Sequence, residues 1–227
     1  MKKKKKIKLQ IALDVIDAKK ALNICKKIQN YIDIIEIGTP LVKSNGLRIV
    51  KKFKKFKKFI LLDLKTMDTG FLESEIAFNS GVDVTTVCAS SNIETIKQSI
   101  KAARKYNKKV LVDLINIKDV EKKTRELLKL ENVPDYICVH TGIDMQNKGK
   151  RPLEDLKKVS EILKNKNQNK NKKKQKKPKL AVAGGINLEN LKEVKKYFPE
   201  IIIVGGAITK SQNPEEIARK LKEIIEN

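Results

Sequence analysis

Residues 180–208 read LAVAGGINLENLKEVKKYFPEIIIVGGAI, and this stretch contains the pattern that decides the fold. A short apolar run ends in two glycines, an amphipathic stretch follows, and a second apolar run again ends in two glycines. Continuous apolar runs joined by a helical stretch are typical of parallel strands that are buried on both faces. The segment therefore predicts a strand–helix–strand unit of an α/β protein.

The same alternation extends through all 227 residues. Strands are expected at 7–13, 34–37, 59–64, 82–87, 110–115, 136–139, 180–183 and 201–204. Helices are expected near 18–29, 41–57, 70–80, 92–106, 118–130, 152–165, 188–197 and 214–226. Asn92 and Asn213, the latter followed by Pro214 and two glutamates, have the chemistry of helix starts. Eight units predict one domain over residues 1–227, a single (β/α)8 TIM-type barrel, with an open doubly wound sheet as the alternative.

One segment, residues 165–179 (NKNQNKNKKKQKKPK), breaks this rhythm. It contains no apolar residue except Pro178 and cannot join a core, so we expect a disordered surface insertion rich in lysine and asparagine. Its place between the sixth helix and the seventh strand predicts the end of the barrel away from the catalytic loops.

Composition excludes several classes of protein. No apolar run approaches the roughly 20 residues that span a bilayer, and the lysine run at 1–6 leads into the first strand without a signal-peptide cleavage site, so a cytoplasmic location is expected. Cys25, Cys88 and Cys138 form no CxxC pair, and we expect buried, inert thiols. A net charge of +24 favours weak, salt-sensitive binding of nucleic acid. Few aromatic residues accompany the charge, so lysines on solvated faces are the simpler interpretation, with no specific nucleic-acid partner.

Polar residues concentrate where the predicted strands end, which is where the active sites of such barrels lie. The residues are Asp14, Glu36, Asp63, Lys65, Asp68, Asp113 and the only histidine, His140. Acids at apolar strand ends are costly unless they are paired, hydrogen-bonded or bound to a metal. Glu36 and Asp63 come from consecutive strands and offer hard oxygen ligands for Mg²⁺, with Mn²⁺ also possible.

The chemistry of two further groups follows from their positions. Lys65 follows Asp63 by two residues, so both side chains are expected on one side of the strand as an ion pair. His140 is the candidate proton shuttle, because the imidazole pKa is near neutral. The pairs Gly184-Gly185 and Gly205-Gly206 follow the last two strands, where many barrels bind phosphate through bare backbone N–H groups and a helix N-terminus. They suit a phosphate site that uses no cationic side chain.

These segments are similar to those of a known family. DLKTMD (63–68), EIGTPL (36–41), HTGIDMQ (140–146), VAGGI (182–186) and VGGAI (204–208) resemble the 3-hexulose-6-phosphate synthases, which belong to the orotidine-5′-monophosphate decarboxylase suprafamily. The resemblance extends from Leu9 to Ile225 and fails only over 165–179. The D-x-K-x-x-D element is common to the suprafamily and does not select a reaction. Glu36 resembles the metal ligand of its Mg²⁺-dependent branch, whereas the nucleotide decarboxylases work without metal.

The resemblance implies a reversible aldol condensation of D-ribulose 5-phosphate with formaldehyde, which gives D-arabino-hex-3-ulose 6-phosphate through an enediolate. It implies Glu36 and Asp63 as metal ligands, His140 as the base, Lys65 as a charge beside the oxyanion, and Asp14 and Asp68 as orienting groups. It also implies a homodimer in which Asp68 reaches across the interface. The alternative within the suprafamily is 3-keto-L-gulonate-6-phosphate decarboxylase or another of its decarboxylases. The former usually carries arginines at places that Thr141, Ile143 and Gly206 occupy here. The alternative from another class is a non-catalytic, basic, nucleic-acid-binding barrel.

Overall fold

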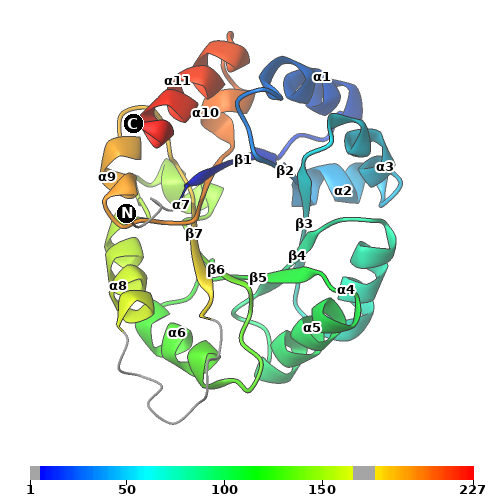
Figure 1. The fold of residues 1–227 in the computed structure, drawn as a ribbon, viewed down its shortest axis with the longest axis vertical. Helices are drawn as coiled ribbons and strands as arrows, with labels where there is room; N and C mark the ends of the chain where they lie inside the picture. Colours follow the sequence, from blue (N-terminus) through cyan, green and yellow to red (C-terminus); the bar gives the residue numbers. More distant parts are fainter. Residues whose placement is uncertain (1–5, 166–176) are drawn as a thin grey trace.

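The structure, a computed structural model, describes residues 6–165 and 177–227 as a closed barrel of eight parallel strands in the order β1 to β8 (Figure 1). The strands are β1 Lys8–Leu13, β2 Ile34–Ile37, β3 Phe59–Thr66, β4 Val84–Cys88, β5 Lys109–Asp113, β6 Tyr136–His140, β7 Lys179–Ala183 and β8 Ile201–Val204. Each strand pairs with the next along the chain, and β8 pairs with β1 to close the ring. The predicted TIM-type barrel is confirmed.

Helices surround the barrel as an outer ring (Figure 1). They are α1 Ala18–Ile28, α2 Thr39–Asn45, α3 Ile49–Phe53, the 3-10 turn η1 Lys54–Phe56, α4 Gly70–Asn79, α5 Ile93–Lys105, α6 Val120–Lys129, α7 Ile143–Asn147, α8 Leu153–Lys164, α9 Leu191–Lys195, α10 Gly206–Thr209 and α11 Pro214–Glu226. The expected caps are present, since Asn92 accepts a hydrogen bond from the Glu94 N–H (3.0 Å) and Asn213 accepts one from the Glu216 N–H (3.2 Å). No helix within 6–165 and 177–227 is long and apolar enough to cross a membrane.

Side chains that alternate along the strands make two separate cores. The larger core lies between the sheet and the helices and includes Ile11, Ile35 and Phe53. The smaller core fills the barrel axis and contains Ala12, Ile34, Leu61, Val84, Leu111, Tyr136, Cys138, Ala181, Ala183, Ile201 and Ile203. The barrel interior is thus packed with apolar side chains, and polar chemistry is confined to its ends.

The predicted helix at 41–57 is wrong, because three short elements occupy its place. α2 ends at Asn45, where Gly46 has a positive φ of 65°, and Lys57 has a left-handed backbone after η1. Glycine favours the end of a helix at this point, so the helix stops there although the apolar spacing continues beyond it. The sequence also did not predict α7 and α10, which are five and four residues long and too short to show a helical period.

An acid stands directly before each even-numbered strand, at the amino-terminal end of the barrel. The carboxylates of Asp33, Asp83 and Asp135 accept hydrogen bonds of 2.9 to 3.1 Å from the N–H groups of Leu9, Ile60 and Val110, respectively. Each acid also meets a cation: Lys222 pairs with Asp33, Lys108 with Asp83, Arg104 with Asp135 and Lys179 with Glu200. The acid–cation pair therefore occurs four times around the barrel, and in three of the four the acid also binds a strand N–H.

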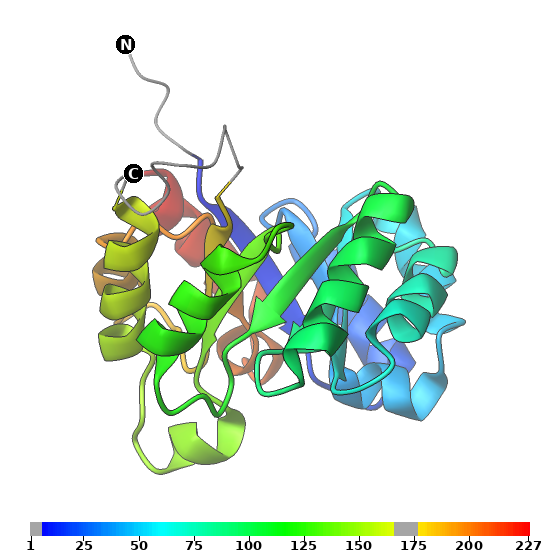
Figure 2. The ribbon, with the colours of Figure 1, turned by 90° about the horizontal axis from the view of Figure 1, so that it is seen from below.

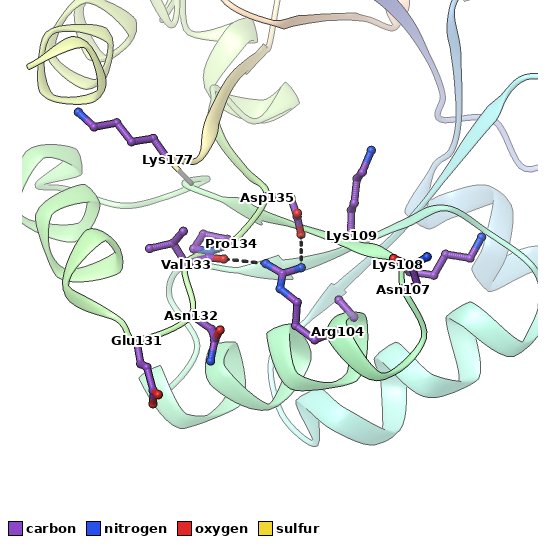
Figure 3. Close-up of a pocket in the computed structure, with 11 residues that line it drawn as sticks. Arg104, Asn107, Lys108, Lys109, Glu131, Asn132, Val133, Pro134, Asp135 and Lys177 are labelled. Atoms are coloured by element: carbon purple, nitrogen blue, oxygen red, sulfur yellow. Dashed lines mark hydrogen bonds and ion pairs between the residues drawn. The ribbon is translucent and has the colours of Figure 1, made fainter. Parts of the chain in front are cut away.

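A hollow of about 350 Å³ lies at this same end of the barrel, between the loops that follow α5 and α6 (Figure 3). Its central cation is Arg104, whose guanidinium donates hydrogen bonds to Asp135 (2.8 Å) and to the carbonyl of Val133 (2.9 Å). Because these partners satisfy the arginine, the hollow is a by-product of a structural joint and not a candidate catalytic centre.

Most of the segment 165–179, for which an insertion was expected, lies outside the described residues. Asn165 closes α8, and Lys179 already belongs to β7. The Lys177 ammonium donates a hydrogen bond to the carbonyl of Asn165 (2.6 Å), so the two ends of the segment lie together. They lie at the amino-terminal end of the strands, whereas α7 projects from the opposite end (Figure 2).

Candidate active site

A ring of polar side chains closes the carboxyl-terminal end of the barrel interior. Six of its members line a cavity of about 20 Å³: Gln10, Glu36, Asp63, Thr86, Asp113 and His140. A space of this size holds one water molecule or one ion. Asp63 and Asp113 are almost fully buried, so their charges must be balanced within the protein.

Asp63 is the most heavily bonded carboxylate of this ring. Its Oδ2 accepts a hydrogen bond from the Thr39 hydroxyl (2.9 Å) and forms an ion pair with Lys65. Its Oδ1 accepts a hydrogen bond from the Thr86 hydroxyl (2.7 Å). These three partners, which come from α2, β3 and β4, fix the carboxylate in one orientation.

Lys65 lies on an irregularity of β3, where the register with β4 shifts between Leu62 and Thr66. Its backbone has a positive φ of 49°, and its N–H donates to the Thr86 hydroxyl (2.9 Å). Left-handed backbone at a bulky residue costs about 1–3 kcal/mol and is concentrated at functional sites. Burial disfavours the charged form, but the carboxylates of Asp63 and Asp113 outweigh it and raise the pKa of Lys65. The lysine therefore stays protonated.

Glu36 is buried on β2, next to the strand that carries Asp63. Burial raises the pKa of Glu36 well above its usual value, and the charges of Asp63 and Asp14 add to the effect. Gln10 donates a hydrogen bond to Glu36 (2.6 Å), while the side-chain oxygen of Gln10 is buried without a partner. The neighbourhood of Glu36 is thus short of positive charge and holds a free oxygen acceptor.

Asp14 lies at the rim, between the turns that follow β2 and β8. A Cβ added to Gly38 would lie only 2.3 Å from Asp14 Oδ1, and one added to Gly205 would lie 3.8 Å from Oδ2. Burial of the carboxyl raises the pKa of Asp14, and the charge of Asp63 contributes. Gly38 therefore leaves the space that this carboxylate occupies.

His140 and Asp113 form the acid–base pair of the site. The Nδ1 atom of His140 lies 2.8 Å from Asp113 Oδ2, and the Ile115 N–H donates to Asp113 Oδ1 (2.9 Å). An ionised carboxylate only accepts hydrogen bonds, so Nδ1 carries the proton and Nε2 keeps its lone pair. Burial lowers the affinity of the ring for a second proton, but Asp113 outweighs it and raises the pKa of His140.

Asp68 is not brought into this ring by its own chain. Its side chain is exposed and, within residues 6–165 and 177–227, accepts a hydrogen bond only from the N–H of the next residue, Thr69 (2.7 Å). Large apolar side chains are exposed beside it, at Met67, Leu72 and Ile76 on and before α4.

The glycines of the two turns after β7 and β8 differ in their surroundings. At Gly184, with φ of 107°, an added Cβ would lie 2.4 Å from the Thr141 carbonyl, so close packing alone demands glycine. At Gly185, with φ of 66°, it would lie 3.3 Å from Cδ of Arg151. An added Cβ at Gly206 would lie 3.8 Å from Cδ and Cε of Lys210. The phosphate role expected of these turns stays a prediction, and the basic side chains of Arg151 and Lys210 pack beside them.

The three cysteines have the surroundings of unreactive thiols. All three are buried. Burial raises the pKa of the Cys25 thiol to about 12 and that of Cys88 to about 11, so neither is a thiolate near neutral pH. Among the described residues, no group of three or more histidine, cysteine or acidic side chains converges as a complete set of metal ligands.

Sequence reasoning missed several residues of the site. It noted Asp113 as an acid of strand five without giving it a partner, and it passed over Gln10, Thr39 and Thr86. Gln10 left a usable signal, because it is the one uncharged polar residue within an apolar strand. The two threonines left none, since threonine is common in strands and turns.

Fold and site together define an enzyme built on a (β/α)8 barrel. The chain belongs to the Orotidine 5′-phosphate decarboxylase / HUMPS family, whose model matches residues 7–221. It is 41% identical over 221 residues to 3-hexulose-6-phosphate synthase of Bacillus subtilis (strain 168), covering 96% of this chain and 99% of the relative.

Solved structures agree with this assignment. A crystal structure of 3-hexulose-6-phosphate synthase from Salmonella typhimurium matches with a TM-score of 0.87 and 34% identity, over 96% of this chain and 98% of that one. Orotidine 5′-monophosphate decarboxylase from Methanocaldococcus jannaschii, complexed with the inhibitor BMP, matches at 28% identity and a TM-score of 0.78, over 97% and 99% of the two chains.

Proposed function

We propose that this enzyme catalyses the reversible condensation of D-ribulose 5-phosphate with formaldehyde to D-arabino-hex-3-ulose 6-phosphate. The names of its relatives at 41% and 34% identity support this reaction. The observation that carries it is the His140–Asp113 pair, which lines the same cavity as Glu36 and Asp63. A base and a cation site on one small cavity suit removal of a proton beside a ketone.

The acidic side of the cavity fits a divalent cation. Burial and like-charged neighbours raise the pKa of Glu36, and a buried oxygen of Gln10 has no partner. Mg²⁺ is bound in proteins by one or two carboxylates while it keeps waters or substrate oxygens, so Glu36 and Asp63 suffice as ligands. Mg²⁺, or Mn²⁺ in its place, would supply Lewis-acid stabilisation of the negative charge that develops on the substrate.

The protein's own residues divide the remaining work. Nε2 of His140 removes the C1 proton of the sugar phosphate, and Asp113 holds the ring in the tautomer that leaves Nε2 free. Lys65 stays protonated and stabilises the developing oxyanion of the enediolate. Asp14, at the rim, orients substrate hydroxyls. The enediolate carbon then attacks formaldehyde to form the new carbon–carbon bond.

The phosphate of the substrate binds at the turns Gly184-Gly185 and Gly205-Gly206. Backbone N–H groups in such turns can approach an anion closely because no side chain intervenes. Ala183, which lines the cavity, directly precedes Gly184, so a sugar phosphate held at these turns lies next to the cavity.

The enzyme acts as a homodimer in this proposal, with Asp68 at the interface. Asp68 is exposed on its own chain, and Met67, Leu72 and Ile76 expose apolar surface around it. Exposed apolar patches of this kind are typical of interfaces between subunits. A second copy that covers α4 would bring Asp68 toward the neighbouring active site.

Incubation with D-ribulose 5-phosphate and formaldehyde tests the reaction, with 3-keto-L-gulonate 6-phosphate as the competing substrate. Condensation without decarboxylation is expected, because Thr141, Ile143 and Gly206 stand where the decarboxylase carries arginines. Release of CO2 from the gulonate at a comparable kcat/KM would contradict the assignment.

His140→Asn tests the base directly. The variant should still bind the sugar phosphate, yet exchange of the C1 proton with deuterated solvent should fall about 10²–10⁴-fold, since this is the usual contribution of a general base. Exchange measured without formaldehyde isolates this first step. Wild-type exchange in the variant would remove His140 from the mechanism.

A further inference from the structure

The guanidinium of Arg151 lies over the first glycine turn. An added Cβ on Gly185 would lie 3.3 Å from Cδ and 3.5 Å from Nε of this arginine. Arg151 stands between α7 and α8, in a loop that follows His140 and its strand. The loop thus brings a cation from the proton-transfer side of the site to the turn where the phosphate is expected.

The orientation of this side chain is fixed on one edge only. Nη1 of Arg151 donates hydrogen bonds to the backbone carbonyls of Gln146 (3.1 Å) and Lys150 (2.8 Å). No carboxylate within residues 6–165 and 177–227 pairs with Arg151, and no hydrogen bond from its Nε or Nη2 is present there. The Nε–Nη2 edge of a guanidinium is a planar fork that fits two oxygens of a phosphate.

The surroundings of the turn are anchored independently of a ligand. The Gln146 amide donates to the Thr141 carbonyl (2.7 Å), and the Asn190 amide donates to the Gly185 carbonyl (2.8 Å). Because both the loop and the turn are held, the position of Arg151 beside Gly185 is set before the substrate arrives. Such preorganisation reduces the entropy lost on binding.

We propose that Arg151 is a binding residue for the substrate phosphate, which it holds through its Nε–Nη2 edge against the Gly184-Gly185 turn. This inference rests on the proposed sugar-phosphate reaction. The decarboxylase carries an arginine at the position of Gly206. In this chain, Arg151 of the α7–α8 loop provides the cation for the phosphate instead. Arg151 thereby selects phosphorylated sugars over free ones.

The test compares Arg151→Met with Lys150→Met, which removes the same charge from the adjacent position of the same loop. Loss of a charge-assisted, two-pronged contact should weaken binding about 10- to 100-fold. We expect the KM for D-ribulose 5-phosphate to rise by this factor in Arg151→Met, with kcat within about threefold of wild type. Arg151→Lys should fall between, since an ammonium keeps the charge but loses the fork. Lys150→Met should match wild type.

Calorimetry with inorganic phosphate and with D-arabinose 5-phosphate separates this inference from the proposed reaction, since neither titration needs turnover. Weaker binding of both ligands in Arg151→Met, but not in Lys150→Met, would support the role even if no condensation were observed. Unchanged affinities in Arg151→Met would overturn it, whatever reaction the enzyme catalyses. Equal losses in both variants would also overturn it, because general charge would then explain the effect.

Discussion

Replacing Asp113 with asparagine removes the charge that holds His140 without changing the shape of the site. The two side chains are joined at 2.8 Å, and Asp113 is 3% exposed, so solvent screens the pair little. Two unit charges about 4 Å apart interact by ~4 kcal/mol at an effective dielectric constant of about 20. This attraction is the contribution that raises the pKa of His140 against the opposing effect of burial.

The direction of the pH effect follows from the role of the ring. A base acts in its neutral form, so the rate falls as the pH drops through the pKa of His140, which Asp113 has raised. In Asp113→Asn, burial and the charge of Lys65 oppose protonation of the ring and only Asp63 favours it, so the pKa of His140 falls and the acid limb of kcat/KM moves to lower pH. The maximal rate should also fall, by about 10²- to 10⁴-fold. The asparagine amide can donate to Nδ1 and impose the wrong tautomer, which costs about 10⁴-fold in serine proteases.

Proton exchange at C1, followed by NMR from pH 5 to pH 9 without formaldehyde, measures both effects. Asp119→Asn is the matched control, because Asp119 caps α6 through the Lys122 N–H (2.9 Å) and asparagine caps equally well. The control should keep the wild-type profile. A wild-type rate and an unshifted acid limb in Asp113→Asn would refute the reasoning.

Three further predictions concern the rest of the site. Glu36→Gln should lower the affinity for Mn²⁺ at least tenfold in a titration followed by electron paramagnetic resonance, with an unchanged melting temperature, because a neutral amide is a poorer ligand. Gly38→Ala should reduce kcat/KM without changing the Mn²⁺ affinity. The added Cβ would lie 2.3 Å from Asp14 Oδ1, so the Asp14 carboxylate would have to move; full activity would contradict this. Deleting 166–176 should keep turnover within about tenfold, a barrier change of ~1.4 kcal/mol. Removal of its six lysines should also weaken salt-dependent RNA binding in filter assays.

The barrel was predictable from the sequence because its strands are continuous apolar runs. All eight strands agree with the expected ranges to within two residues at both ends, and β2 and β8 agree fully. The expected Asp63–Lys65 ion pair was also predictable, since it depends on spacing within one strand. Both predictions depend only on residues that are close together in the sequence.

Contacts between elements were not predictable in the same way. The pairing of Asp113 with His140 joins residues 27 positions apart and depends on the register of β5 against β6. Arg151 reaches the glycine turn from a loop, and the path of a loop cannot be predicted from a helical or strand period. The break after α2 depends on the backbone of one glycine, Gly46, which apolar spacing does not report.

The acids before the even-numbered strands recur at a nearly regular spacing along the sequence. Asp33, Asp83 and Asp135 follow one another at 50 and 52 residues, whereas Glu200 comes 65 residues after Asp135, and the extra length spans the lysine-rich segment 165–179. The backbone N–H of each acid donates to the first residues of the preceding strand, at Leu9, Ile60, Val110 and Leu180. The Lys8 N–H donates to the Glu200 carbonyl (2.9 Å), so the seam between the chain ends is bonded at the same level as the other joints. Because the four quarters of the ring are joined in the same way, the barrel does not depend on which quarter comes first in the chain. A circular permutant that links the termini and opens at 166–176 should therefore close the same barrel from a different first quarter.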